Sequence, residues 1–125
     1  MEKYLYIAVG GALGSIARYW LSSTISGRFG TRFPYGTFVI NMTACVIIGF
    51  VLTYLGERAE LNTAWRFLIA VGFVGAYSTF STYEWETLSH LRSGAFLLAG
   101  FYAVGSLLLG LVAVWCGTQL AKVIG

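Results

Sequence analysis

Four long apolar segments limit what this chain can fold into more than any other feature of its sequence. They cover approximately residues 4–24, 36–56, 65–91 and 95–122, and each is close to the roughly 20 residues that an α-helix needs to cross a bilayer. A backbone inside a membrane must satisfy its own hydrogen bonds, which favours helices. The sequence therefore predicts an all-α integral membrane protein, with one domain over residues 1–125 and four transmembrane helices.

The composition supports this prediction. Of the 125 residues, 58% are hydrophobic and only 10% are charged, a balance that a water-soluble domain of this size would not tolerate. The first apolar segment passes through Arg18 into Tyr19 and Trp20 without a small-residue cleavage pattern, so we interpret it as a mature span rather than a signal peptide. Cys45 and Cys116 lie inside apolar segments, where they are interpreted as small buried residues.

Basic residues are divided almost evenly between the two faces of the predicted bundle. Four crossings place both termini on one side, together with Lys3, Arg58, Arg66 and Lys122, and place on the other side Arg28, Arg32 and Arg92. Orientation normally follows an excess of Lys and Arg in the cytoplasmic loops, and four against three is almost no excess. Either other signals select one topology, or copies insert both ways and pair as an antiparallel dimer.

Several polar side chains interrupt the apolar segments, where they are costly without partners. Asn41 shares a helix face with Thr37, and its amide either bonds a neighbouring helix or donates to a passing anion. Arg18 either extends to the interface or lines an aqueous vestibule that concentrates anions. Tyr102 and Ser106 lie four residues apart on one face and would continue a polar track.

The acidic residues and the histidine near the end of the third segment are interpreted as interfacial. We expect Glu84 and Glu86 to be hydrated or paired with a basic side chain, and His90 to lie at the interface beside Arg92. The sequence contains no Ser-His-Asp set, Cys-x-x-Cys pair or carboxylate pair that would indicate catalysis. We therefore do not expect an enzyme.

Small residues in the first and fourth segments indicate close helix packing. Gly10, Gly11 and Gly14 include a G-x-x-x-G spacing, which would suit a phosphate loop only after a strand and otherwise indicates helix contact. We expect the same packing role for Gly105 and Gly110.

The third segment carries a polar stretch that predicts a discontinuous helix. Gly72 and Gly75 precede residues 77–83, where six of seven side chains carry a hydroxyl. Irregular backbone at membrane depth is tolerated only where it is buried or faces water, and its free carbonyls suit a cation. Phe80 and Tyr83 point to one side of the resumed helix. Their positive ring edges would stabilise a small dehydrated anion, unless they merely pack against lipid or other helices.

Three motifs occur in order along the chain: GGALGSIARY, PYGTFVIN and GFVGAYSTFSTY. In order and spacing they resemble the signatures of the Fluc-type fluoride channels, also called the CrcB family, and the resemblance covers nearly the whole chain. It implies a fluoride-selective channel in the inner (plasma) membrane that lets cytoplasmic fluoride leave passively and lowers its toxicity. It also implies a dual-topology antiparallel homodimer.

The same resemblance implies roles for individual residues. The family's pore asparagine corresponds to Asn41, and its two pore-facing phenylalanines correspond to Phe80 and Tyr83, where the tyrosine departs from the family by adding a phenolic donor. The hydroxyls along the fluoride path correspond to Thr37, Thr82, Tyr102 and Ser106. A non-transported sodium ion (Na+) at the dimer centre would be held by the backbone carbonyls of Gly75 and Ser78, the second of which is usually threonine in the family.

Two other functions remain open at this point. A proton-coupled small multidrug-type exporter needs a carboxylate within its first span, whereas this span contains Arg18 and has no acid after Glu2. A non-transporting membrane assembly subunit would use the hydroxyls only to join helices. Nucleic acid is not an expected partner.

Overall fold

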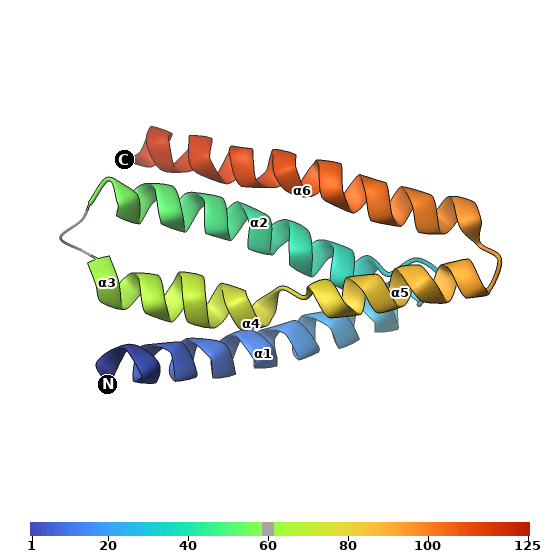
Figure 1. The fold of residues 1–125 in the computed structure, drawn as a ribbon, viewed down its shortest axis with the longest axis horizontal. Helices are drawn as coiled ribbons and strands as arrows, with labels where there is room; N and C mark the ends of the chain where they lie inside the picture. Colours follow the sequence, from blue (N-terminus) through green and yellow to red (C-terminus); the bar gives the residue numbers. More distant parts are fainter. Residues whose placement is uncertain (59–61) are drawn as a thin grey trace.

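The structure, a computed structural model, describes residues 1–58 and 62–125, and the described residues form helices and short connections only. Figure 1 shows long rows of helix lying side by side, with the N- and C-termini at the same end. The rows are α1 (Glu2–Phe29), α2 (Tyr35–Gly56), a segmented third row, and α6 (Phe96–Ile124). The predicted all-α class is confirmed.

Two of these rows have the properties of membrane spans. Helices α2 and α6, with 22 and 29 residues, are long and apolar enough to cross a bilayer. Helix α1 reaches 28 residues but carries more polar side chains, and the third row is divided. The presence of apolar, membrane-capable helices is therefore confirmed, and the arrangement of four spans stays a prediction.

The third row is interrupted where the polar stretch begins. It consists of α3 (Asn62–Trp65), the π-helix η2 (Arg66–Val74), α4 (Gly75–Tyr77) and α5 (Phe80–Arg92). Between α4 and α5 the backbone is extended at Ser78 (φ −79°, ψ 156°) and Thr79 (φ −148°, ψ 112°). The predicted discontinuity is confirmed: it lies at Ser78–Thr79, inside the polar stretch 77–83, and residues 75–77 remain helical.

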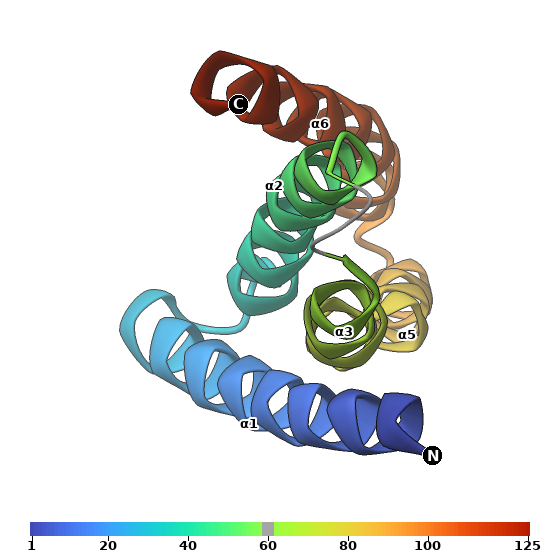
Figure 2. The ribbon, with the colours of Figure 1, turned by 90° about the vertical axis from the view of Figure 1, so that its left-hand side faces the viewer.

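The two halves of the third row pack against different helices. Segments η2 and α4 pack mainly against α1, whereas α5 packs mainly against α6. Seen along the bundle, α2 lies between α1 and α6, and the third row lies to one side (Figure 2). The break is therefore the point at which the third row passes from one neighbour to another.

Glycines allow the tightest helix contacts. A Cβ atom added to Gly14 would lie 2.2 Å from the carbonyl oxygen of Phe73, and one added to Gly49 would lie 2.2 Å from that of Val114. The expected packing role is thus confirmed for the first segment, where α1 meets η2. Within this chain, a Cβ added to Gly105 would meet none of the described atoms within 4 Å, so no close helix contact is seen there.

The buried core lies beside the break, whereas the outer faces remain apolar. Ile40, Ala44, Val74 and Tyr77 form the core cluster, and α5 contributes no buried residue. Large apolar side chains on the outer face of α6 are exposed, including Leu97, Phe101, Leu108, Leu111 and Trp115. Apolar surface of this extent indicates contact with lipid or with another chain.

Candidate functional site

Asn41 of α2 anchors the break through two hydrogen bonds to one residue. The backbone N–H of Thr79 donates to Asn41 Oδ1 at 2.9 Å, and Asn41 Nδ2 donates to the Thr79 carbonyl at 3.2 Å. The extended backbone of Thr79, which is only 8% exposed, is thereby satisfied by a side chain. Asn41 therefore joins two helices, and because a carboxamide has a second N–H, it keeps one donor for another ligand.

The bond from Thr79 to Asn41, together with the cap bond described next, leaves two backbone carbonyl oxygens at the break without their usual helical donors. In a continuous helix the N–H of Thr79 would bond the Gly75 carbonyl and that of Thr82 would bond the Ser78 carbonyl. Instead, Thr79 donates to Asn41, and Thr82 donates to Thr79 Oγ1 at 3.3 Å. The Ser78 hydroxyl donates to the Val74 carbonyl at 3.0 Å. The carbonyls of Gly75 and Ser78 thus lack their usual helical donors, and free carbonyl oxygens are chemically suited to a cation that takes oxygen ligands.

A cavity of about 390 Å³ adjoins the break. It is lined by residues from α2, η2, the break, α5 and α6, namely Asn41, Met42, Ala44, Cys45, Ile48, Val74, Ser78, Thr79, Phe80, Tyr83, Ser106 and Leu107. The structure thus brings together five of the predicted site residues. Among the described residues, Ser106 Oγ is buried without a hydrogen-bond partner, a condition that costs about 1–3 kcal/mol unless a ligand supplies one.

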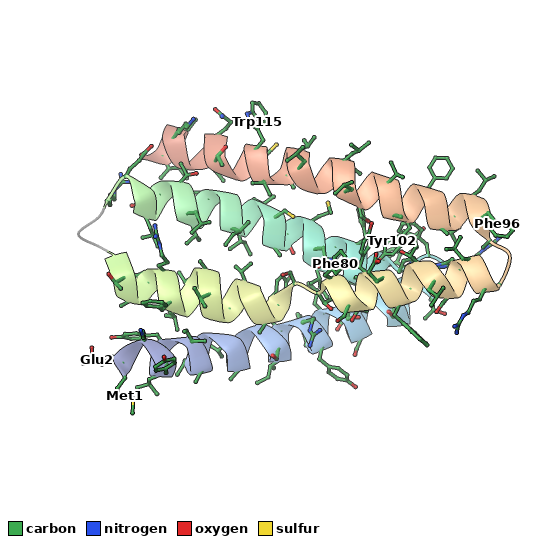
Figure 3. All side chains as sticks on the ribbon, in the orientation of Figure 1. Met1, Glu2, Phe80, Phe96, Tyr102 and Trp115 are labelled. Atoms are coloured by element: carbon green, nitrogen blue, oxygen red, sulfur yellow. The ribbon has the colours of Figure 1, made fainter. Side chains whose placement is uncertain are left out.

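The two aromatic residues of α5 lie side by side at this cavity. The ring centroids of Phe80 and Tyr83 are 5.8 Å apart, which confirms that they point to one side. Phe80 is 74% exposed and lies at the start of α5 in Figure 3. The Tyr83 hydroxyl donates to the Ala103 carbonyl of α6 at 2.5 Å. The phenol that departs from the family pattern therefore ties α5 to α6, and its ring faces the cavity.

A second polar cluster surrounds Glu86, one turn beyond Tyr83. Thr37 Oγ1 donates to Glu86 Oε2 at 3.1 Å, and the Tyr102 hydroxyl donates to Glu86 Oε1 at 2.9 Å. Thr37 is 4% exposed and Tyr102 is 1% exposed. Figure 3 shows Tyr102 in the crowded space between α5 and α6. In the described part of the chain, two buried hydroxyls hold the Glu86 carboxylate in place of the expected basic side chain.

Sequence reasoning missed Glu86 as a site residue, although a signal was present. Thr79, Tyr83, Glu86 and His90 follow the spacing i, i+4, i+7, i+11, which places them on one helix face. This face carries the contacts to Asn41, to α6, to Thr37 and Tyr102, and to the α1–α2 connection. Charge alone suggested an interfacial position, whereas the helix face indicated a partnered one.

Two predicted site residues, Thr82 and Arg18, belong neither to the cavity lining nor to the Glu86 cluster among the described residues. Thr82 belongs to the N-terminal cap of α5, where its hydroxyl accepts from Thr79 Oγ1 at 3.0 Å. Arg18 is half-exposed on α1 and is not among the residues that line the cavity in the described part of the chain. Their roles on a fluoride path stay predictions.

The two clusters are adjacent. The ring centroids of Tyr83 and Tyr102 are 5.2 Å apart, so aromatic contact connects the cavity at the break to the hydroxyls around Glu86. Together these groups form a line of hydrogen-bond donors and ring edges inside an apolar bundle. Such a line can take a small ion out of water by replacing its hydration.

Comparisons with known proteins identify relatives over almost the full length. A family model described as CrcB-like protein, Camphor Resistance (CrcB), matches residues 5–118. The chain is 53% identical to a protein of Acidobacterium capsulatum named fluoride-specific ion channel FluC, over 92% of each chain. It is 48% identical to a protein of the same name from Solibacter usitatus, over 96% of this chain and 98% of the relative. A third relative of that name, from a Synechococcus strain, is 43% identical over 93% of this chain.

Proposed function

The chain belongs to the CrcB family, and we propose that it is a fluoride-selective ion channel. It allows fluoride to leave the cytoplasm passively, down its electrochemical gradient, and so lowers fluoride toxicity. The observation that carries this proposal is that polar side chains gather at the cavity beside the break and again around Glu86, with the rings of Tyr83 and Tyr102 in contact between the two. A channel moves its ion without chemical change, so the protein is not an enzyme.

Fluoride is a small and strongly hydrated anion, and a selective path must replace its water with closely spaced donors. At the cavity, the second amide N–H of Asn41 and the unpartnered hydroxyl of Ser106 serve this purpose. The ring edges of Phe80 and Tyr83 provide positive potential beside them. Thr82 and Arg18 would act farther out, Arg18 in the vestibule.

The Glu86 cluster is the second stage of the path. The hydroxyls of Thr37 and Tyr102 are the donors that fluoride needs, and they already bond the Glu86 carboxylate. A fluoride ion that uses them must therefore displace the carboxylate. Glu86 is the competing acceptor in this proposal, and it limits which anions pass.

We further propose that the chain crosses the inner membrane four times and works as an antiparallel homodimer. The nearly balanced basic residues support insertion in both orientations, and the exposed Phe80 ring beside an open cavity supports a second copy there. A structural sodium ion would lie at the dimer centre, held by the carbonyls of Gly75 and Ser78 from both copies. The diversion of Thr79 and Thr82 away from those carbonyls supports this site.

Purified protein in liposomes tests the proposal. A fluoride electrode should record rapid efflux when an ionophore balances the charge, and chloride efflux under the same conditions should be negligible. Absence of fluoride efflux in sodium-containing buffer would reject the channel. Efflux that requires a pH gradient would instead favour a proton-coupled exporter. Crosslinking from both faces of the membrane tests the antiparallel dimer.

A further inference from the structure

Several hydroxyl side chains inside the helices of this chain bond back to their own helix. A helical serine or threonine can donate to the carbonyl oxygen three or four residues earlier. Thr87 of α5 donates to the Tyr83 carbonyl at 2.9 Å, and Thr118 of α6 donates to the Trp115 carbonyl at 2.6 Å. Such a bond satisfies the hydroxyl, and any ligand must then compete with the carbonyl for it.

Ser106 of α6 departs from this pattern. Its Oγ atom is buried and has no hydrogen-bond partner among the described residues, and the residue lines the cavity beside the break. Its place in α6 offers two acceptors, the Ala103 carbonyl three residues earlier and the Tyr102 carbonyl four residues earlier. The hydroxyl bonds neither of them, so its proton remains available to an acceptor in the cavity.

The Ala103 carbonyl is already engaged by two other donors. A carbonyl oxygen has two lone pairs. In α6 one of them accepts the N–H of Leu107, four residues later. The Tyr83 hydroxyl of α5 donates to the same oxygen at 2.5 Å. The phenol therefore takes the place that the Ser106 hydroxyl would occupy, and one of the two acceptors within reach of Ser106 is closed to it.

We propose that Tyr83 is a positioning residue: its phenol occupies the Ala103 carbonyl and so keeps the Ser106 hydroxyl free to donate to fluoride. This role rests on the proposed channel function, because it assigns that hydroxyl to fluoride. Without the phenol, one lone pair of the Ala103 carbonyl would be open and the Ser106 hydroxyl would turn to it. Fluoride would then have to break this bond before it gained the hydroxyl.

A double-mutant cycle of fluoride efflux from liposomes tests the coupling. One neutral hydrogen bond changes an equilibrium by roughly two- to tenfold, so Ser106→Ala should lower the wild-type efflux rate by about that factor. Tyr83→Phe should still conduct, at a rate lowered by a similar factor. Ser106→Ala added to Tyr83→Phe should change the rate by less than about twofold, because the hydroxyl is already withdrawn from the path.

The same cycle separates positioning from a merely structural role. If Tyr83 only ties α5 to α6, the effects of the two substitutions should multiply, and that result would overturn the proposal. An unchanged efflux rate in Ser106→Ala alone would also overturn it. Thr118→Val is the matched control, because it removes a hydroxyl of α6 that bonds its own helix, and it should leave the efflux rate unchanged in both backgrounds.

A crystal structure of Tyr83→Phe tests the position of the hydroxyl without any flux. In this variant Ser106 Oγ should lie within hydrogen-bond distance of the Ala103 carbonyl oxygen. If Ser106 Oγ keeps its wild-type position, the positioning role is wrong. If Ser106 turns to Ala103 while the wild type passes no fluoride, the proposed function fails and the positioning of Ser106 by Tyr83 stands.

Discussion

The double bond between Asn41 and Thr79 allows the break to be tested by one substitution. Asn41→Ala removes the acceptor of the Thr79 N–H and the donor to the Thr79 carbonyl. Thr79 is 8% exposed, so both backbone groups lose their partner in a largely dry place. Each such group costs about 1–3 kcal/mol. The substitution should therefore destabilise the break by about 2–6 kcal/mol.

Amide hydrogen exchange at Thr79 is the direct assay. A local loss of about 2 kcal/mol corresponds to roughly 30-fold faster exchange, since about 1.4 kcal/mol is tenfold. Asn41→Asp is the matched control, because its carboxylate still accepts from the Thr79 N–H but no longer donates to the carbonyl. In this variant the Thr79 amide should stay protected. Its fluoride current should nevertheless be lost, because a negative charge then lies on the path.

The two variants test different parts of this prediction. Unchanged exchange at Thr79 in Asn41→Ala would show that Asn41 does not anchor the break. Wild-type current in Asn41→Asp, with the dimer folded, would remove Asn41 from the fluoride path. Loss of current together with loss of folding in Asn41→Asp would show that the carboxylate cannot replace the amide as an anchor.

Three further predictions test other parts of the structure. Tyr83→Phe removes the hydrogen bond to α6 and should lower the free energy of unfolding by about 0.5–1.5 kcal/mol. The variant should still conduct fluoride because the ring remains. A variant without fluoride current would show that the phenol is essential. Ser78→Ala should be mild in fluoride flux assays because the proposed sodium ligand is the carbonyl, whereas replacing sodium by a large organic cation should abolish flux; the opposite pattern would reject backbone ligation. Gly49→Ala should strongly reduce the yield of folded protein, because its Cβ would lie 2.2 Å from an α6 carbonyl oxygen. Gly105→Ala is the control and should be tolerated. Equal yields of the two variants would contradict the packing.

The positions of the helices were predictable from the sequence, because the length of an apolar segment is a local property. The first helix is longer than expected, Glu2–Phe29 rather than 4–24, since polar residues extend a helix beyond its apolar part. The π-helix at Arg66–Val74 has no comparable signature, because its residues are as apolar as those of an α-helical span. The discontinuity itself was predictable from Gly75 and the hydroxyls that follow.

The exact place of the break was not predictable from local sequence. Thr79 is extended because Asn41, 38 residues earlier, satisfies its backbone, and no nearby residue indicates that partner. The partners of Glu86 were not predictable for a related reason: they depend on how α5 packs against α2 and α6. The sequence did identify three candidate site residues, Asn41, Thr37 and Tyr102. Polar residues inside apolar segments are conspicuous wherever their partners lie.

The pairing of the helices has a consequence for how the chain is made. Helix α1 packs mainly against η2, and α2 packs mainly against α6, so α1 can meet its principal neighbour once Val74 has been synthesised, whereas α2 must wait for the last helix. Contacts between segments distant in sequence form slowly, because the intervening chain must first be ordered. During biosynthesis α1 and the first half of the third row can therefore pack together before α6 is made. Helix α2 obtains its principal contact last, so the bundle is completed only when the final helix emerges from the ribosome.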